Sequence, residues 1–150
     1  MVANKKHFVN DHGFFYTGVK APSRKYGRGK IGTTEKSRLN DRISGIKNKE
    51  KDFELCAFLR IENCTKAQLE YVESYTRMKL EKTYQHVQND HFEFDMTSKA
   101  QGYNTFVNTA LEYAIEACNL QGFQYMVVHT KIFGKKMGKI EHMIATMLDR

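Results

Sequence analysis

The chain has 150 residues, of which 41% are hydrophobic, and it carries a formal net charge of +7. This length is typical of one domain, and the apolar fraction is sufficient for a hydrophobic core. The sequence has no run of about 18 apolar residues that would span a membrane, and residues 1–10 lack the apolar segment of a secretory signal, so we do not expect a secreted protein. Cys56, Cys64 and Cys118 are odd in number and form no Cys-x-x-Cys pair. We therefore expect buried, reduced thiols in a cytoplasmic-type compartment of a cell or virus-infected host.

The positive charge is concentrated in the first third of the chain. Residues 1–51 contain 13 Lys or Arg and 4 Asp or Glu, whereas the remaining residues contain 11 and 13. A solvated lysine-rich surface would give the same excess. Because the basic residues are interleaved with Tyr16, Tyr26 and several glycines, the imbalance favours a partner that carries phosphate groups.

The first half of the chain predicts strands that alternate with a loop and a helix. Residues 14–19 form a short apolar run that predicts a strand, and residues 20–29, with the one proline and two glycines, predict a hairpin loop. Residues 30–33 are predicted to return as a strand. Ser37 can cap a helix that runs to about residue 47, and residues 53–61 predict a further apolar strand.

The second half is predicted to be richer in helices. Thr65-Lys66-Ala67-Gln68 has the form of a capping box and predicts a helix that runs to about residue 82. The remaining predicted segments are an extended piece at 91–94, a helix at 103–119 that ends near Gly122, a strand at 125–129 and a last helix at 139–148. This order indicates an α+β fold, with a small sheet flanked by helices and a tail of roughly 55 residues.

Two short motifs resemble the signature of the GIY-YIG nucleases. Gly13-Phe14-Phe15-Tyr16 stands where the first motif has its glycine, apolar pair and tyrosine, and Lys30-Ile31-Gly32 stands for the second. Lys30 replaces the usual tyrosine of the second motif, as in divergent phage, viral and restriction-enzyme branches, where Thr33-Thr34 also has counterparts. Lys30 is the natural substitute for the missing tyrosine.

The resemblance covers about residues 13–94 and implies both a fold and an activity. The implied fold is a three-stranded antiparallel sheet flanked by helices, which would occupy residues 1–95. Residues 96–150 would then be a mainly helical C-terminal extension packed on that core. The implied activity is endonucleolytic cleavage of DNA with Mg²⁺ or Mn²⁺, by a protein of phage, viral or mobile-element type.

The family places an arginine on the helix after the second motif. Its usual spacing falls on Asn40, between Arg38 and Arg42. At about 100° per residue, Arg42 lies nearer than Arg38 to the apolar side of that helix. We therefore assign the catalytic role to Arg42, while a solvated helix arginine remains the alternative for both residues.

A metal-binding glutamate is implied on the helix that begins after Thr65. Glu73 lies beside Leu69 and Leu80 at the edge of the predicted apolar face, whereas Glu70 lies among polar residues. A metal ligand has to be held by packing and yet open to a cleft, which favours Glu73 over Glu70. The predicted apolar face consists of Leu69, Tyr71, Val72, Tyr75, Met78 and Leu80.

These assignments imply a hydrolytic mechanism. Glu73 would hold one Mg²⁺ or Mn²⁺, which polarises the phosphate. Tyr16 would orient or deprotonate the attacking water, for which a phenol needs nearby positive charge. Lys30 and Arg42 would supply that charge and stabilise the transition state. Glu93 is interpreted as a residue that supports the site.

The basic loop and the following helix supply the predicted contacts to nucleic acid, which are Arg24, Lys25, Tyr26, Arg28 and Arg38. His86 and His91 are not at ligand spacing, and we interpret all six histidines as surface or satisfied side chains.

Two other functions remain open. The chain is alternatively a nucleic-acid-binding domain that kept the fold and lost cleavage, or a virion or replication-complex protein whose basic arm binds a polyanion.

Overall fold

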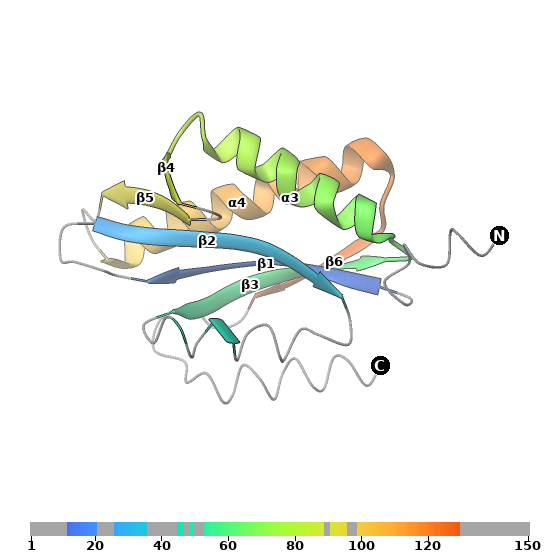
Figure 1. Ribbon diagram of the computed structural model, residues 1–150, viewed down its shortest axis with the longest axis horizontal. Coiled ribbons are helices and arrows are strands. Elements are labelled where there is room, and N and C mark those ends of the chain that lie inside the picture. Colours follow the sequence, from blue (N-terminus) through green and yellow to red (C-terminus); the bar gives the residue numbers. More distant parts are fainter. Residues whose placement is uncertain are drawn as a thin grey trace.

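The computed structural model describes residues 12–20, 26–35, 45–46, 49, 53–88, 91–95 and 99–129. Within this part, one antiparallel sheet has the strand order β4-β5-β2-β1-β3-β6, and two long helices cover one of its faces (Figure 1). The elements are β1 (His12–Lys20), β2 (Tyr26–Glu35), β3 (Glu54–Glu62), α3 (Lys66–Leu80), β4 (Gln85–Gln88), β5 (His91–Asp95), α4 (Lys99–Gln121) and β6 (Tyr125–His129).

The central strand β1 is buried on both faces. It pairs with β2 from Gly13 opposite Glu35 to Lys20 opposite Arg28, and its other edge pairs with β3. Side chains of successive strand residues point to opposite faces, so the odd-numbered residues of β1 face the helices and the even-numbered residues face away from them. Two separate clusters of apolar side chains therefore form, one on each face of the same strand.

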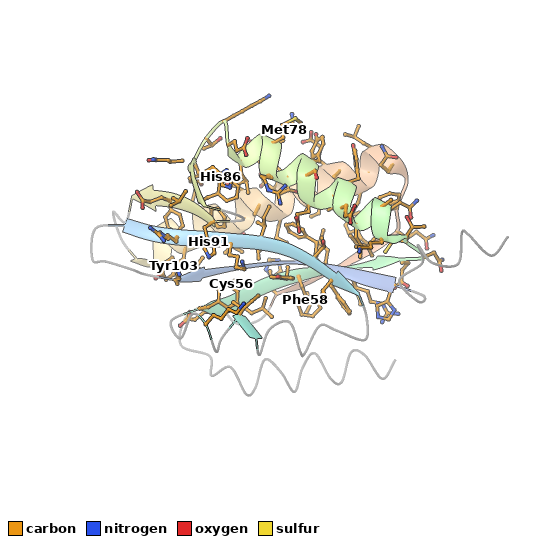
Figure 2. The ribbon with its side chains drawn as sticks, in the orientation of Figure 1. Cys56, Phe58, Met78, His86, His91 and Tyr103 are labelled. Carbon is orange, nitrogen blue, oxygen red and sulfur yellow. The ribbon has the colours of Figure 1, made fainter. Side chains whose placement is uncertain are left out.

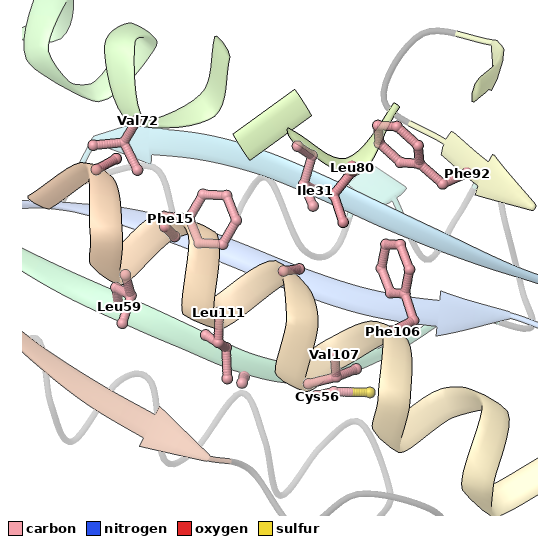
Figure 3. Packing of buried hydrophobic residues seen from close by; sticks show 14 of the residues in the cluster. Phe15, Ile31, Cys56, Leu59, Val72, Leu80, Phe92, Phe106, Val107 and Leu111 are labelled. Atoms are coloured by element: carbon pink, nitrogen blue, oxygen red, sulfur yellow. The ribbon is translucent and has the colours of Figure 1, made fainter. Parts of the chain in front are cut away.

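The larger cluster lies between the sheet and the two helices (Figure 3). Phe15 on β1 and Ile31 on β2 meet Val72 from α3, while Phe106 and Val107 from α4 fill the rest of the space. These side chains are excluded from solvent, and each buried side chain of this size contributes about 1.5–3 kcal/mol to folding. The two helices are thereby fixed against β1 and β2.

The smaller cluster lies on the opposite face of the sheet, and Figure 2 shows Phe58 on the side away from α3. Its rings pack edge to face, with the centroids of Phe14 and Phe58 5.5 Å apart. The buried members are Phe14, Tyr16, Ile46, Phe53, Leu55 and Phe58.

The helix α3 begins at the predicted capping box. The Thr65 side chain accepts a hydrogen bond from the Gln68 amide at 3.1 Å, and the Thr65 amide donates to the Gln68 side chain at 2.8 Å. Leu69, Val72 and Leu80 are buried as predicted.

The prediction for Met78 was wrong, because its side chain is 49% exposed and lies on the side of α3 away from the sheet (Figure 2). Met78 follows Leu69 by nine residues, which at about 100° per residue places it on the opposite side of the helix.

The α+β class is confirmed, but the predicted three-stranded sheet is wrong in strand number. The strands β5 and β6 arise from the segments predicted as extended at 91–94 and 125–129, and they extend the three central strands on both sides. The strand β4, with the sequence Gln85-His86-Val87-Gln88, was not predicted. It lies at the edge of the sheet and has no apolar alternation from which a strand can be recognised.

The described part of the predicted C-terminal extension belongs to the same sheet and core. The helix α4 supplies Phe106, Val107 and Leu111 to the larger cluster, and β6 pairs with β3 from Ala57 opposite His129 to Ile61 opposite Tyr125. The helix ends at Gln121, and Gly122 follows with a φ of 72°, a left-handed conformation that favours glycine.

Several predictions lie outside the described residues, namely those for Arg24, Lys25, Arg38, Arg42 and the helix at 139–148. Of the helix predicted to begin at Ser37, the structure describes Gly45 and Ile46, both helical. No described helix combines the length and the apolar character needed to cross a membrane.

Candidate functional site

The candidate site lies along the second half of β2. The strand β5 pairs with β2 only from Tyr26 to Lys30, whereas β1 pairs with β2 as far as Glu35. From Ile31 onward, β2 therefore has a strand partner on one side alone within the described part of the chain. This stretch forms an edge where side chains from both faces of the sheet approach the same backbone.

Glu73 approaches this edge from the helical face. The Thr33 hydroxyl donates a hydrogen bond to Glu73 Oε1 at 3.2 Å, and Arg77 Nη2 donates to Oε2 at 2.6 Å. The Glu73 side chain is 22% exposed, whereas Glu70 is on the solvent side of α3. Glu73 thus lies at the edge of the buried face and is held by a hydrogen bond on each carboxylate oxygen. Its role as a metal ligand remains a prediction.

Tyr16 approaches the same edge from the opposite face. It pairs with Gly32 across the β1–β2 ladder, and a Cβ atom at Gly32 would lie 2.4 Å from the Tyr16 hydroxyl oxygen. The tyrosine side chain therefore crosses β2 where only glycine leaves room for it. Tyr16 is 2% exposed and packs in the smaller cluster with Phe14 and Phe58.

The structure brings Tyr16 and Glu73 to adjacent residues of β2 but to opposite faces of the sheet. Tyr16 lies against Gly32 and Glu73 lies against Thr33, with the β2 backbone between them. Because the β2 backbone separates the two side chains, a water molecule bound to the Glu73 carboxylate would not also contact the Tyr16 hydroxyl. The predicted cooperation of the two residues therefore requires a substrate that reaches around the β2 edge.

Lys30 lies on the Tyr16 face, because it precedes Gly32 by two residues along the strand. It is half-buried and pairs with Gly18 on β1 and with His91 on β5. The predicted proximity of Lys30 to Tyr16 thus agrees with the strand register. Arg42, the other predicted cation, is not among the described residues.

Arg28 and Glu93 form an ion pair on the same face. Arg28 Nε lies 3.8 Å from Glu93 Oε2, and Nε has no hydrogen-bond partner within the described residues although it is buried. Glu93 thus contacts the basic strand rather than Glu73. Tyr26 is the first residue of β2, two positions before Arg28.

A divalent cation at Glu73 would meet few protein ligands and would have to be largely hydrated. The oxygen atoms that could bind a metal at this point belong to the Glu73 carboxylate and the Thr33 hydroxyl. The described residues contain no group of three or more His, Cys, Asp or Glu side chains that could hold a metal. Mg²⁺ commonly keeps several water ligands and is held by one or two carboxylates together with substrate phosphates. The ion pair with Arg77 occupies Oε2, so Glu73 Oε1 and Oε2 would both have to serve a cation in competition with existing partners.

Thr33 and Arg77 both contact Glu73, and no role was predicted for either side chain from the sequence. The spacing of Glu73 and Arg77 is i to i+4, a helical ion-pair pattern that can be read from sequence. The contact of Thr33 with Glu73 joins residues 40 positions apart, and no local pattern indicates it.

The cysteines do not contribute a reactive thiol to this site. Cys56, Cys64 and Cys118 are free and buried. Burial raises the pKa of Cys56 and of Cys118 to about 12 and the pKa of Cys64 to about 11. A thiol with such a pKa is not a thiolate at neutral pH, and nucleophilic chemistry requires the thiolate.

The chain matches no protein-family model, no curated protein and no solved structure. The resemblance to the GIY-YIG nucleases therefore rests on the motif residues alone.

Proposed function

We propose that this protein is a metal-dependent endonuclease that hydrolyses phosphodiester bonds in DNA, with a divergent GIY-YIG-like site of phage, viral or mobile-element type. The observation that carries the proposal is the convergence on Gly32 and Thr33. The Tyr16 hydroxyl reaches this point from one face and the Glu73 carboxylate from the other. A phosphate at the β2 edge would have Glu73 and Arg77 on one face, and Tyr16 and Lys30 on the other.

Glu73 and Arg77 would act on the helical face. The carboxylate would hold a hydrated Mg²⁺ or Mn²⁺, which when bound supplies Lewis-acid polarisation of a phosphate oxygen. Arg77, which lies beside the carboxylate, would donate hydrogen bonds to the phosphate through its planar guanidinium group. The Thr33 hydroxyl would hold Oε1 in place.

Tyr16 and Lys30 would act from the other face. The Tyr16 ring is fixed by packing against Gly32, so its hydroxyl can orient a water molecule at the strand edge without loss of side-chain entropy on binding. Lys30 would place a positive charge on that face and stabilise the negative charge that develops on the phosphate.

A second candidate, a nucleic-acid-binding domain without cleavage, is favoured by two features of the same site. Arg77 pairs with Glu73 at 2.6 Å, which neutralises the carboxylate, and Tyr16 is almost completely buried. In this alternative Tyr16 is a core residue and the Glu73–Arg77 pair fastens α3 near β2.

Cleavage of supercoiled plasmid separates the two candidates. The purified protein is incubated with plasmid in Mg²⁺, in Mn²⁺ and in EDTA, and the Glu73→Gln protein, purified in parallel, controls for contaminating nucleases. Nicking that requires the metal and is lost in Glu73→Gln supports the endonuclease. Plasmid that remains supercoiled in both metals, together with DNA binding in a gel-shift assay, would establish the second candidate instead.

A further inference from the structure

The two outermost strands of the sheet differ in how they are protected against pairing with another chain. Within the described residues, the sheet ends at β4 on one side and at β6 on the other. The strand β4 is largely polar, and its register against β5 shifts between His86 and Gln88. An irregularity of this kind bends an edge away from further pairing. The strand β6 has no such shift, because each of its residues pairs with β3 in one continuous register.

The pairing with β3 fixes which backbone groups of β6 point outward. The Glu62 amide donates a hydrogen bond of 2.9 Å to the carbonyl oxygen of Gln124, just before β6 begins. In an antiparallel ladder, residues that exchange hydrogen bonds with the neighbouring strand alternate with residues whose N–H and C=O groups point away from it. The odd-numbered residues of β6 therefore direct their backbone groups to the outer edge of the sheet. These residues are Tyr125, Val127 and His129.

The side chains of β6 leave this edge apolar and without permanent charge. Tyr125 and Val127 pack against the larger cluster, whereas Val128 packs against the smaller one. Met126 lies on the same face as Val128, and its side chain is 42% exposed. Charged side chains commonly prevent pairing at natural sheet edges, and β6 contains no Lys, Arg, Asp or Glu. An edge strand of this kind can accept a further strand through its backbone.

We propose that the outer edge of β6 is a dimerisation surface, at which β6 of a second copy of this chain pairs in antiparallel orientation. Val127 lies opposite the same residue of the second copy, and Tyr125 lies opposite the second copy's His129. Each facing pair then exchanges two hydrogen bonds, because all of these residues direct their N–H and C=O groups outward. The resulting contact is isologous, as in most homodimers, and it does not depend on the proposed function.

Register and charge favour a second copy as the strand that pairs here. The outward-directed residues are symmetric about Val127, so self-pairing uses every one of their backbone groups. A shift by two residues in either direction would leave Tyr125 or His129 without a facing residue in the second β6. Self-pairing also places no two charges of the same sign opposite each other. The exposed Met126 side chain lies opposite Val128 of the second copy and is thereby covered.

The first test is the mass of the protein in solution, measured by light scattering after gel filtration over a range of micromolar concentrations. We expect a mass twice the 17.5 kDa of one chain. Val127→Pro removes an outward N–H group without removing a hydrogen bond to β3, so this variant should have the mass of one chain. Val87→Pro is the matched control on the other edge, where Val87 pairs with no residue of β5, and it should remain a dimer.

Met126→Lys is a second variant that leaves the backbone of β6 intact. It places a charge at the covered position of each copy, and it should also give the mass of one chain while its melting temperature stays close to that of wild type. A wild-type protein with the mass of one chain at every concentration would overturn the proposal. A dimer that persists in both Val127→Pro and Met126→Lys, or that is lost in Val87→Pro, would overturn it as well.

The register is tested by disulfide formation between two different single variants. Residues opposite each other in a pair without hydrogen bonds have Cα atoms about 4.5 Å apart, which is within the range that a disulfide can bridge. Met126→Cys and Val128→Cys proteins are mixed with oxidised glutathione and separated on a non-reducing gel. We expect a covalent dimer from the mixture and much less from either protein alone, since the native cysteines are buried. Equal amounts from the separate proteins would contradict this register.

Discussion

The two faces of the sheet at Gly32 and Thr33 differ in how their functional side chains are held. On the helical face, Glu73 is half-buried and bound by polar contacts to Thr33 and Arg77. On the other face, Tyr16 is enclosed by aromatic side chains and fixed by contact with Gly32. Polar contacts at a half-exposed site can be exchanged for a ligand, whereas close-packed rings cannot move without cost. The comparison shows that the helical face is suited to changing partners and the other face to fixed geometry.

The largest expected effect is that of Glu73→Gln, which tests the helical face. Loss of a carboxylate ligand should lower the rate of metal-dependent nicking about a thousandfold or more, because the amide oxygen binds a divalent cation weakly. DNA affinity in EDTA should change little. Glu70→Gln, on the exposed side of α3, should nick at the wild-type rate. A Glu70→Gln protein without activity beside an active Glu73→Gln protein would show that the other carboxylate binds the metal.

The opposite face is tested by Tyr16→Phe, which removes one hydroxyl and keeps the ring. If the hydroxyl orients the attacking water, nicking should fall by about a hundredfold or more while the melting temperature remains close to that of wild type. Tyr75→Phe is the matched control, since the Tyr75 hydroxyl bonds to Glu116 on the outer surface of the helices. Full activity of Tyr16→Phe would mean that Tyr16 serves only in packing, and the comparison of the two faces would then favour the binding domain.

The contact between Tyr16 and β2 is tested by Gly32→Ala. The new Cβ atom would lie 2.4 Å from the Tyr16 hydroxyl oxygen and 2.5 Å from Cζ, so the ring has to shift within a close-packed cluster. We expect a loss of about 1–3 kcal/mol in the free energy of unfolding, measured by urea denaturation. Gly45→Ala is the control, for which we expect the opposite sign. A Cβ atom at Gly45 would meet no atom within 4 Å, and Gly45 is helical. Because alanine is favoured over glycine in a helix, this variant should be more stable by up to about 1 kcal/mol. Equal stability of the two variants would contradict the close approach.

The smallest expected effect is that of Thr65→Ala, which acts on the helical face alone. Loss of the capping hydrogen bond to the Gln68 amide should lower the free energy of unfolding by about 1 kcal/mol. Because the cap fixes the start of the helix that carries Glu73, nicking should fall modestly while DNA affinity in EDTA is unchanged. Ser74→Ala, at an exposed position within the helix, should have no destabilising effect. A DNA affinity that falls with Thr65→Ala would show that the two faces are coupled.

The elements that could be predicted from the sequence are those that local interactions specify. The capping box at Thr65 and Gln68 was recognised because both of its hydrogen bonds join residues three apart. The strand at 125–129 was predicted, and the end of the preceding helix near Gly122 was predicted from the preference of helix ends for glycine. The polar edge strand β4 was not predicted, because it has no apolar alternation. The number of strands in the sheet was not predicted either, because pairing between distant segments leaves no periodic trace in either segment.

For the candidate site, the sequence by itself determined that Glu73 lies at the edge of the buried face of a helix and that Tyr16 lies on a strand beside the glycine-containing return strand. Only the tertiary structure decided which face of the sheet each side chain occupies. The reason lies in β1, where every residue from His12 to Val19 is buried. A strand buried on both faces has no polar side, so its alternation does not reveal whether Phe15 or Tyr16 faces the helices. That choice was made by the packing of α3 and α4, which cover Phe15 and leave Tyr16 to the opposite cluster.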